Sequence, residues 1–140
     1  MSQSALWGSI ISFGFVAIGF VIALSKKGRV GVTTIGSRRR ELFVPGDPAT
    51  VFARLQRINP RLRIDDASPG STQLVLSTPP SLFTWGFLYP VNIQEHVGGS
   101  RVEIGIRSRL FQIGPIVSRA HMQCVNDVSQ VLGVPAARVA

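Results

Sequence analysis

The residue types best suited to chemistry in this chain are a histidine and a cysteine three positions apart. His121 and Cys124 fall in a segment with helical periodicity, over about 116–132, so the spacing places both on one turn. A Cys–His nucleophile also needs a third group to orient the histidine and donors for an oxyanion, and the nearby sequence supplies neither. We therefore interpret Cys124 as a core residue and His121 as a partly exposed neighbour.

The other polar side chains do not form a catalytic or metal-binding set. Asp65 and Asp66 are adjacent in a predicted strand, where alternate side chains point to opposite faces, so we expect solvated strand-end residues. His96 has no second metal ligand close in sequence, and no glycine-rich loop follows a strand and opens a helix. A single cysteine excludes an intrachain disulfide. The sequence thus predicts a protein that is not an enzyme and needs no cofactor or metal.

An uninterrupted apolar segment covers positions 5–24. These twenty residues contain no charge, proline, asparagine or glutamine, and as a helix they span about 30 Å, the thickness of a bilayer core. A cleaved signal peptide would begin with basic residues and have a shorter apolar stretch, whereas residues 1–4 contain no Lys or Arg. We expect an uncleaved transmembrane anchor over 1–25, with Trp7 in the outer headgroup layer.

Most of the excess positive charge follows this segment directly. The formal net charge is +8, and residues 25–40 carry six basic and no acidic side chains, whereas nine basic and seven acidic residues follow. The basic cluster consists of Lys26, Lys27, Arg29, Arg38, Arg39 and Arg40. Basic residues after an anchor favour the cytoplasmic side and attract anionic lipid headgroups. We expect an inner (plasma) membrane location with the N-terminus outside, and no nucleic-acid partner, since no aromatic residues interleave the cluster.

Small residues recur along the apolar segment at a spacing of four. They are Ser4, Gly8 and Ser12, and then Gly19 and Ala23. Rows of this kind let two helices approach closely in lipid, where no hydrophobic drive brings them together. Two interpretations stay open: contact with a partner helix, or the ordinary abundance of glycine and serine in membrane helices.

A change of periodicity marks an α+β domain over 39–134, after a basic juxtamembrane linker at 26–38 and before a tail at 135–140. Strands are predicted within 39–45, 61–67, 72–78, 85–97 and 101–110, and helices within 46–60 and 116–132. The order is β-α-β-β-β-β-α, with both helices expected across one face of a curved antiparallel sheet. Asp47 is suited to cap the first helix and Gly133 to end the second. Pro90 predicts an edge position or a bulge for its strand.

Two stretches of this domain resemble known families. The stretch FVPGDPATVFARL is similar to the strand–proline–helix entry of START-like, helix-grip domains. The stretch SRVEIGIRSRLFQIG resembles a small uncharacterised bacterial family with an Arg-Ser-x-Ser-Arg-x-Gly motif, matched here by Arg107, Ser108, Arg109 and then Gly114. The second serine is missing and the glycine is displaced. START-like domains often hold an apolar ligand between sheet and C-terminal helix, and in a carrier of this kind Trp85, Phe87 and Tyr89 would line the cavity. With only five predicted strands, a filled interior is the alternative.

Arginines on the outward parity of the last predicted strand indicate either an ordinary solvated sheet face or a docking patch. Arg101, Arg107 and Arg109 form it, and Arg61 and Arg63 would extend it toward an acidic partner or lipid headgroups. Together these features predict a non-catalytic, single-pass accessory subunit that assembles, stabilises or regulates a larger integral membrane protein complex. The alternative is a membrane-tethered binder or carrier of a hydrophobic ligand or lipid.

Overall fold

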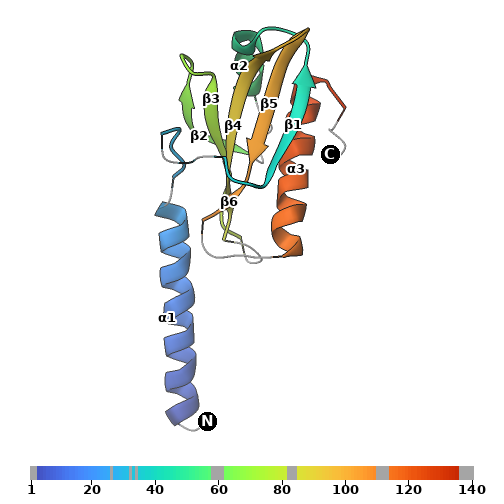
Figure 1. Ribbon diagram of the computed structural model, residues 1–140. Helices are drawn as coiled ribbons and strands as arrows, with labels where there is room; N and C mark the ends of the chain where they lie inside the picture. Colours follow the sequence, from blue (N-terminus) through green and yellow to red (C-terminus); the bar gives the residue numbers. More distant parts are fainter. Residues whose placement is uncertain are drawn as a thin grey trace.

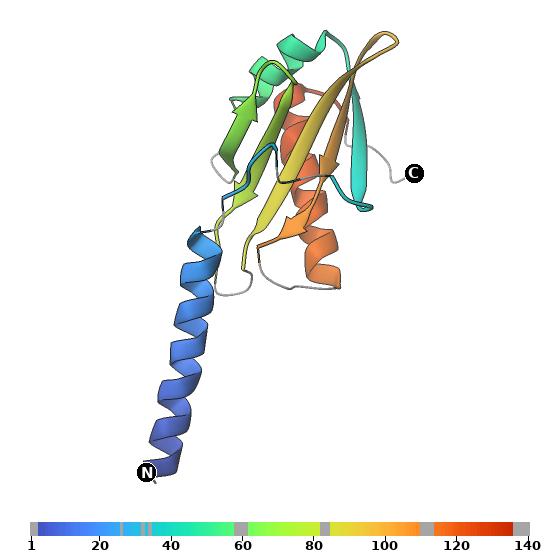
Figure 2. The same ribbon diagram turned by 60° about the vertical axis from the view of Figure 1, so that its left-hand side comes forward.

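A long N-terminal helix, α1 (Gln3–Ser25), projects from one end of an α+β domain in the computed structural model (Figures 1 and 2). The structure describes residues 3–25, 27–31, 33, 35–57, 62–81, 85–109 and 114–135. Within α1, Trp7–Ser25 is long and apolar enough to cross a membrane, with a mean hydropathy of 2.1. Its large apolar side chains are exposed in this chain, from Trp7 at one end to Leu24 at the other.

An antiparallel sheet forms the centre of the domain. Its strands are β1 (Arg39–Val44), β2 (Arg63–Ser68), β3 (Gln73–Thr78), β4 (Phe87–His96), β5 (Gly99–Gly105) and β6 (Arg107–Ser108). Their spatial order is β1-β5-β4-β3-β2, and the short β6 also pairs with β4. The predicted α+β class and the antiparallel sheet with packed helices are therefore confirmed.

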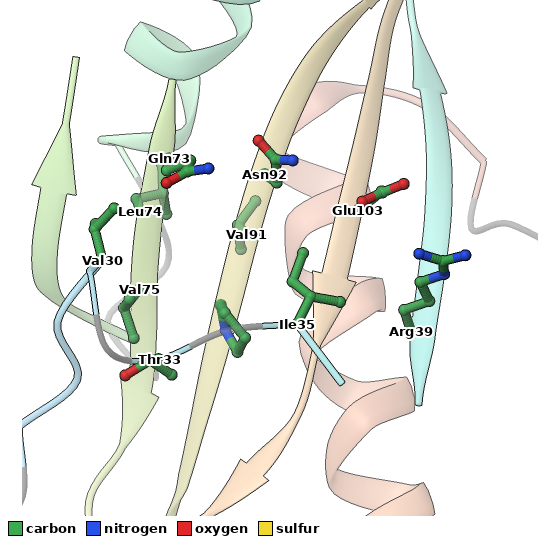
Figure 3. Close-up of a pocket in the computed structure, with 11 residues that line it drawn as sticks. Val30, Thr33, Ile35, Arg39, Gln73, Leu74, Val75, Val91, Asn92 and Glu103 are labelled. Atoms are coloured by element: carbon green, nitrogen blue, oxygen red, sulfur yellow. The ribbon is translucent and has the colours of Figure 1, made fainter. Parts of the chain in front are cut away.

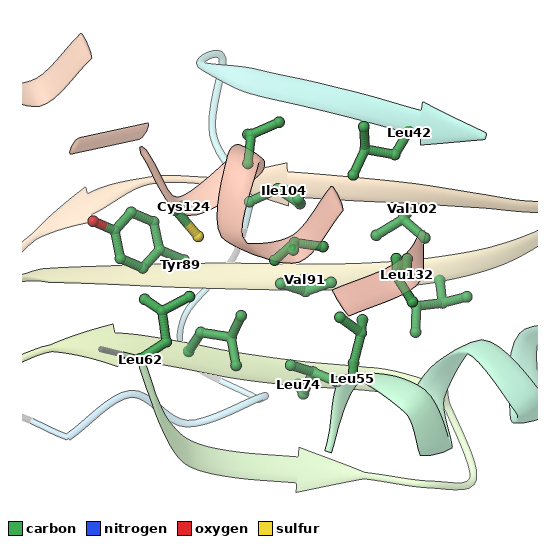
Figure 4. Packing of buried hydrophobic residues seen from close by; sticks show 14 of the residues in the cluster. Leu42, Leu55, Leu62, Leu74, Tyr89, Val91, Val102, Ile104, Cys124 and Leu132 are labelled. Atoms are coloured by element: carbon green, nitrogen blue, oxygen red, sulfur yellow. The ribbon is translucent and has the colours of Figure 1, made fainter. Parts of the chain in front are cut away.

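Two helices cover one face of the sheet, which we call the inner face. Helix α2 (Pro48–Leu55) begins at Asp47, whose carboxylate accepts a hydrogen bond from the Thr50 amide, as the sequence predicts. Helix α3 (Pro115–Leu132) ends at Gly133, whose φ of 67° permits the left-handed cap. The inner face buries alternate residues of the strands against both helices (Figure 4). The core includes Leu42, Leu74, Leu76, Tyr89, Val91, Val102, Ile104, Val51, Leu55, Cys124, Val128 and Leu132.

Pro90 explains why the predicted strand over 101–110 is divided. The expectation of an edge strand or bulge is wrong, because β4 lies between β3 and β5. The pairs Val91↔Ile104 and Leu88↔Arg107 belong to one register, which places Gly105 opposite Pro90. Proline has no amide hydrogen, so the ladder is interrupted there, and β6 resumes beyond the gap. The sheet therefore accommodates a proline in a central strand by dividing the neighbouring strand into β5 and β6.

Candidate functional site

The C-terminal end of α1 is held by an arginine of the domain, 86 residues further along the chain. Arg109 donates a hydrogen bond from Nη1 to the backbone oxygen of Ala23, at 2.9 Å. This carbonyl is among the last four of the helix, which have no partner within it. A cation at this end also favours the helix dipole. Arg109 is only 6 % exposed and Ala23 is fully covered, so the contact is dry.

Asp65 connects this arginine to the chain that leaves α1. Its Oδ2 atom lies 4.0 Å from Arg109 Nη2 and accepts a hydrogen bond from the Gly28 amide at 2.8 Å. Its Oδ1 atom accepts a hydrogen bond from the Ser77 hydroxyl at 2.6 Å. Burial lowers the pKa of Arg109, and the Asp65 carboxylate opposes that shift. We call Ala23, Gly28, Asp65, Ser77 and Arg109 the junction.

Asp66 binds the same segment one step further on. Its Oδ2 atom accepts a hydrogen bond from the Val30 amide at 2.8 Å. Strict alternation would turn the two aspartates to opposite faces, but the β2–β3 register shifts between Ile64 and Asp66, and this bulge lets both carboxylates reach the segment. The expectation of solvated strand-end residues is therefore wrong.

The described part of the predicted linker lies across the outer face of the sheet, opposite α2 and α3 (Figure 1). A Cβ atom at Gly28 would overlap Val75, so only glycine allows this approach. Further along, Thr33 is buried, and Ile35 packs over Gly105. Between segment and sheet lies the outer-face cavity of about 310 Å³, with Arg39, Gln73, Asn92 and Glu103 among its lining residues (Figure 3).

Trp85 packs against α1 and does not reach into the domain interior. A Cβ atom built at Gly19 would lie 3.1 Å from Cη2 of this indole, so a small residue is required at the contact. Gly19 and Ala23 of the small-residue row therefore face the chain's own domain, contrary to an exclusive role toward a partner. Gly8 has open space around it, and the exposed Ser12 hydroxyl donates to the Gly8 carbonyl. The side chain of Ser4 lies outside the described residues.

Phe87 and Tyr89 belong to the packed core. They are 2 % and 1 % exposed, and the Tyr89 hydroxyl donates to the Ala120 carbonyl of α3 at 3.4 Å. Burial raises the pKa of this phenol strongly, so it stays protonated. The expectation that the three rings line one ligand cavity is wrong, because Trp85 packs against α1 whereas Phe87 and Tyr89 pack among the buried side chains of the core.

The basic cluster divides into two groups. Lys27 and Arg29 are exposed close to the end of α1, and Lys26 lies outside the described residues. Residues 38–40 are carried to the start of β1 and line a second cavity beside α3, of about 330 Å³. We call this the β1–α3 cavity. The second group therefore does not follow α1 directly, although the sequence places all six cations in one run.

The predicted arginine patch is only partly assembled. Arg101 donates to the Gln94 amide oxygen at 2.6 Å and lies 3.3 Å from Glu103, while Arg107 is exposed. Arg109 is buried in the junction, so the expectation that it belongs to an exposed patch is wrong. Its amide donates to the Gly86 carbonyl, so the backbone pairing continues past β6 and the side chain keeps the outward direction of Arg107. There it meets Asp65 beneath the segment that leaves α1. Arg63 is exposed, and Arg61 lies outside the described residues.

His121 and Cys124 are both buried, which confirms the core interpretation of Cys124 and corrects that of His121. Nε2 of His121 lies 2.8 Å from the Ile104 backbone oxygen. Burial lowers the pKa of this imidazole, and Arg40 and Arg38 lower it further, against the opposing hydrogen bond. Burial raises the pKa of the Cys124 thiol. An activated cysteine requires the opposite shift, so this pair lacks the properties of a nucleophile.

Comparison with known proteins supports the fold alone. No protein-family model matches the sequence, and no curated protein matches it. The crystal structure of Ara h 8.0201 is similar, with a TM-score of 0.52 and 9 % identity over 68 % of this chain and 93 % of that chain. A DUF4468 family protein from Bacteroides ovatus aligns with a TM-score of 0.36 and 12 % identity, over 73 % and 88 % of the two chains. The first match supports a START-like, helix-grip fold.

The junction is the main feature that sequence reasoning missed. One signal was available: Gly28 stands between Lys27 and Arg29, and a lone glycine in such a run is suited to close backbone approach. The contribution of Arg109 had no comparable signal, because its partner is a backbone carbonyl of α1.

Proposed function

We propose that the chain is a single-pass accessory subunit of a larger membrane protein complex, without catalytic activity of its own. Helix α1 crosses the inner (plasma) membrane with the N-terminus outside, and the START-like domain lies against the cytoplasmic surface. Lys27 and Arg29 contact anionic lipid headgroups there. The domain contributes assembly, stability or regulation to an integral membrane partner.

The observation that carries this proposal is an exposed apolar helix whose last turn is fixed to a folded domain. The large apolar side chains between Trp7 and Leu24 are exposed, and a surface of this kind requires lipid or other helices around it. A removable leader needs no buried contacts with the mature protein, whereas here Ala23 and Gly19 are covered by Arg109 and Trp85. The junction supports a retained helix that sets the orientation of the domain.

The helix also offers a face for a partner. Gly8 and Gly19 are eleven residues apart, which is about 20° from an exact number of turns, so the two glycines share one face. Gly19 is covered by the domain, and Gly8 continues the same face deeper in the proposed bilayer with nothing within 4 Å. A neighbouring helix would pack closely at Gly8 and Ser12.

The test is purification of the full chain from its native membranes in mild detergent, followed by native electrophoresis and identification of the associated proteins. We expect a particle much larger than the 15.1 kDa chain. Gly8→Leu should release the chain from this particle, because a large side chain blocks close helix contact. Gly14→Leu is the matched control, since Gly14 also has nothing within 4 Å but lies about 120° around the helix from Gly8. Recovery of the unmodified chain only as a free monomer would overturn the proposal.

The alternative function is that of a membrane-tethered carrier of an apolar ligand or lipid. Its support is the likeness in fold to Ara h 8.0201. The tight burial of Phe87 and Tyr89 where such a ligand would lie speaks against it. The test is mass spectrometry of organic extracts from the purified chain and from the Gly8→Leu monomer, both washed in the same detergent. A stoichiometric apolar molecule that is also retained by the Gly8→Leu monomer would support a carrier. A molecule that is found with the unmodified chain but is lost from the variant would be annular lipid.

A further inference from the structure

The β1–α3 cavity has a strongly cationic lining. Its walls are formed by Ser37, Arg38, Arg39, Arg40, Val117, Ser118 and His121, with no acidic residue among them. Its volume of about 330 Å³ is in the range of small-molecule sites. β1 is an edge strand, so the cavity opens at the side of the sheet. The remaining polar groups of the lining are two serine hydroxyls and one imidazole.

One guanidinium in this cavity has an unmet hydrogen-bonding requirement. Nη1 of Arg40 is buried and has no hydrogen-bond partner among the described residues. Arg40 lies opposite Ile104 in the β1–β5 register, and the Ile104 carbonyl is engaged by His121. A buried charged donor without a partner is costly, and native proteins usually supply an acceptor, water or ion.

The cation density here also has no counter-charge. Burial is the main cause of the lowered pKa of His121, the nearby charges of Arg40 and Arg38 lower it further, and no carboxylate in the cavity lining offsets them. A guanidinium fork matches the oxygens of a phosphate group, and two such forks with a serine hydroxyl provide donors from several directions. Ser118, the fourth residue of α3, supplies this hydroxyl near the positive end of the helix dipole.

We propose that the β1–α3 cavity is a binding site for a phosphate group, with Arg38 and Arg40 as its principal ligands. The group belongs either to a soluble phosphorylated molecule or to the headgroup of an anionic lipid. The second source is within reach because α3 begins at the end of the domain from which α1 emerges (Figures 1 and 2). The site is independent of the proposed partner complex.

The test uses the full chain in nanodiscs of phosphatidylcholine, with histidines labelled for nuclear magnetic resonance. Inorganic phosphate is titrated in, and the pKa of His121 is followed. We expect a saturable rise of this pKa, because a bound anion offsets the charges of Arg38 and Arg40. The resonances of His96, at the far end of β4, act as an internal reference. A second arm omits free phosphate and includes phosphatidic acid in the nanodisc.

Two variants make the result specific. Arg40→Gln should weaken phosphate binding at least about tenfold, the loss of one charged hydrogen bond. Arg38→Gln should weaken it too, and Arg38 is exposed, so that variant retains the fold. Arg54→Gln removes the same charge at an exposed position of α2, and this variant should bind normally. A response only to phosphatidic acid would assign the site to headgroups; a response to free phosphate would assign it to soluble ligands. No response in either arm, or equal responses in Arg40→Gln and Arg54→Gln, would overturn the proposal.

Discussion

Replacing Arg109 by methionine should loosen α1 from the domain. Methionine keeps much of the apolar stem but cannot donate to the Ala23 carbonyl, at 2.9 Å in the structure. A hydrogen bond from a charged group contributes about 1.5–3 kcal/mol. At 4.0 Å from Asp65, the gross attraction is about 4 kcal/mol for an effective dielectric constant near 20, and the cost of burying both charges offsets most of it. Asp65 keeps its bonds from Gly28 and Ser77, so we expect a loss of about 2–4 kcal/mol in total.

The assay is urea unfolding of the full chain in a neutral detergent, read by circular dichroism and by the emission of Trp85. The chain has two tryptophans, so Trp7→Phe makes Trp85 the sole reporter of the contact with Gly19. Arg107→Met is the matched control, since Arg107 is exposed on β6. Asp65→Asn completes a double-mutant cycle, in which a coupling above about 0.5 kcal/mol identifies a direct interaction. If Arg109→Met unfolds like Arg107→Met and leaves the Trp85 emission unchanged, the junction does not hold the helix.

Three further predictions follow from individual contacts. Gly28→Ala should cost about 1–3 kcal/mol in denaturation experiments, because the new methyl group overlaps Val75, whereas Gly31→Ala, with nothing within 4 Å, should be nearly neutral. Since the pKa of His121 is lowered in the fold, the unfolded chain takes up its proton first, so stability should fall as pH drops below about 6.5. His121→Gln should remove that component of the pH dependence of urea unfolding, and a wild-type slope that persists in the variant would contradict the assignment. Cys124 should resist iodoacetamide in the folded chain and react only on unfolding, as mass spectrometry would show, because its thiol is buried and its pKa raised.

Periodicity was sufficient to predict the domain because its signals are local. Alternation along β4 and β5, and the caps at Asp47 and Gly133, each arise within a few residues, and the structure agrees with them. The division of the last strand is different. It requires the knowledge that Pro90 lies opposite Gly105, and this is a property of register between strands.

The junction could not be predicted for a related reason. Its polar contacts join residues 37 and 86 positions apart, and two of the acceptors or donors are backbone groups that every residue carries. The types of side chain along the sequence therefore contain no pattern that predicts these contacts. Alternation also misled at β2, because the bulge between Ile64 and Asp66 lets both aspartates reach the same segment. The charge run illustrates the same limit, since its last three arginines are separated from the first ones by a segment packed on the sheet.

The two attachments of α1, at Gly19 and Ala23, lie one helical turn apart, about 6 Å along its axis. A helix held at two such points cannot rotate about its axis or change its angle independently of the domain that holds it. With α1 spanning a bilayer as proposed, a helix tilt imposed by bilayer thickness would also tilt the sheet and change which of its edges faces a neighbouring protein.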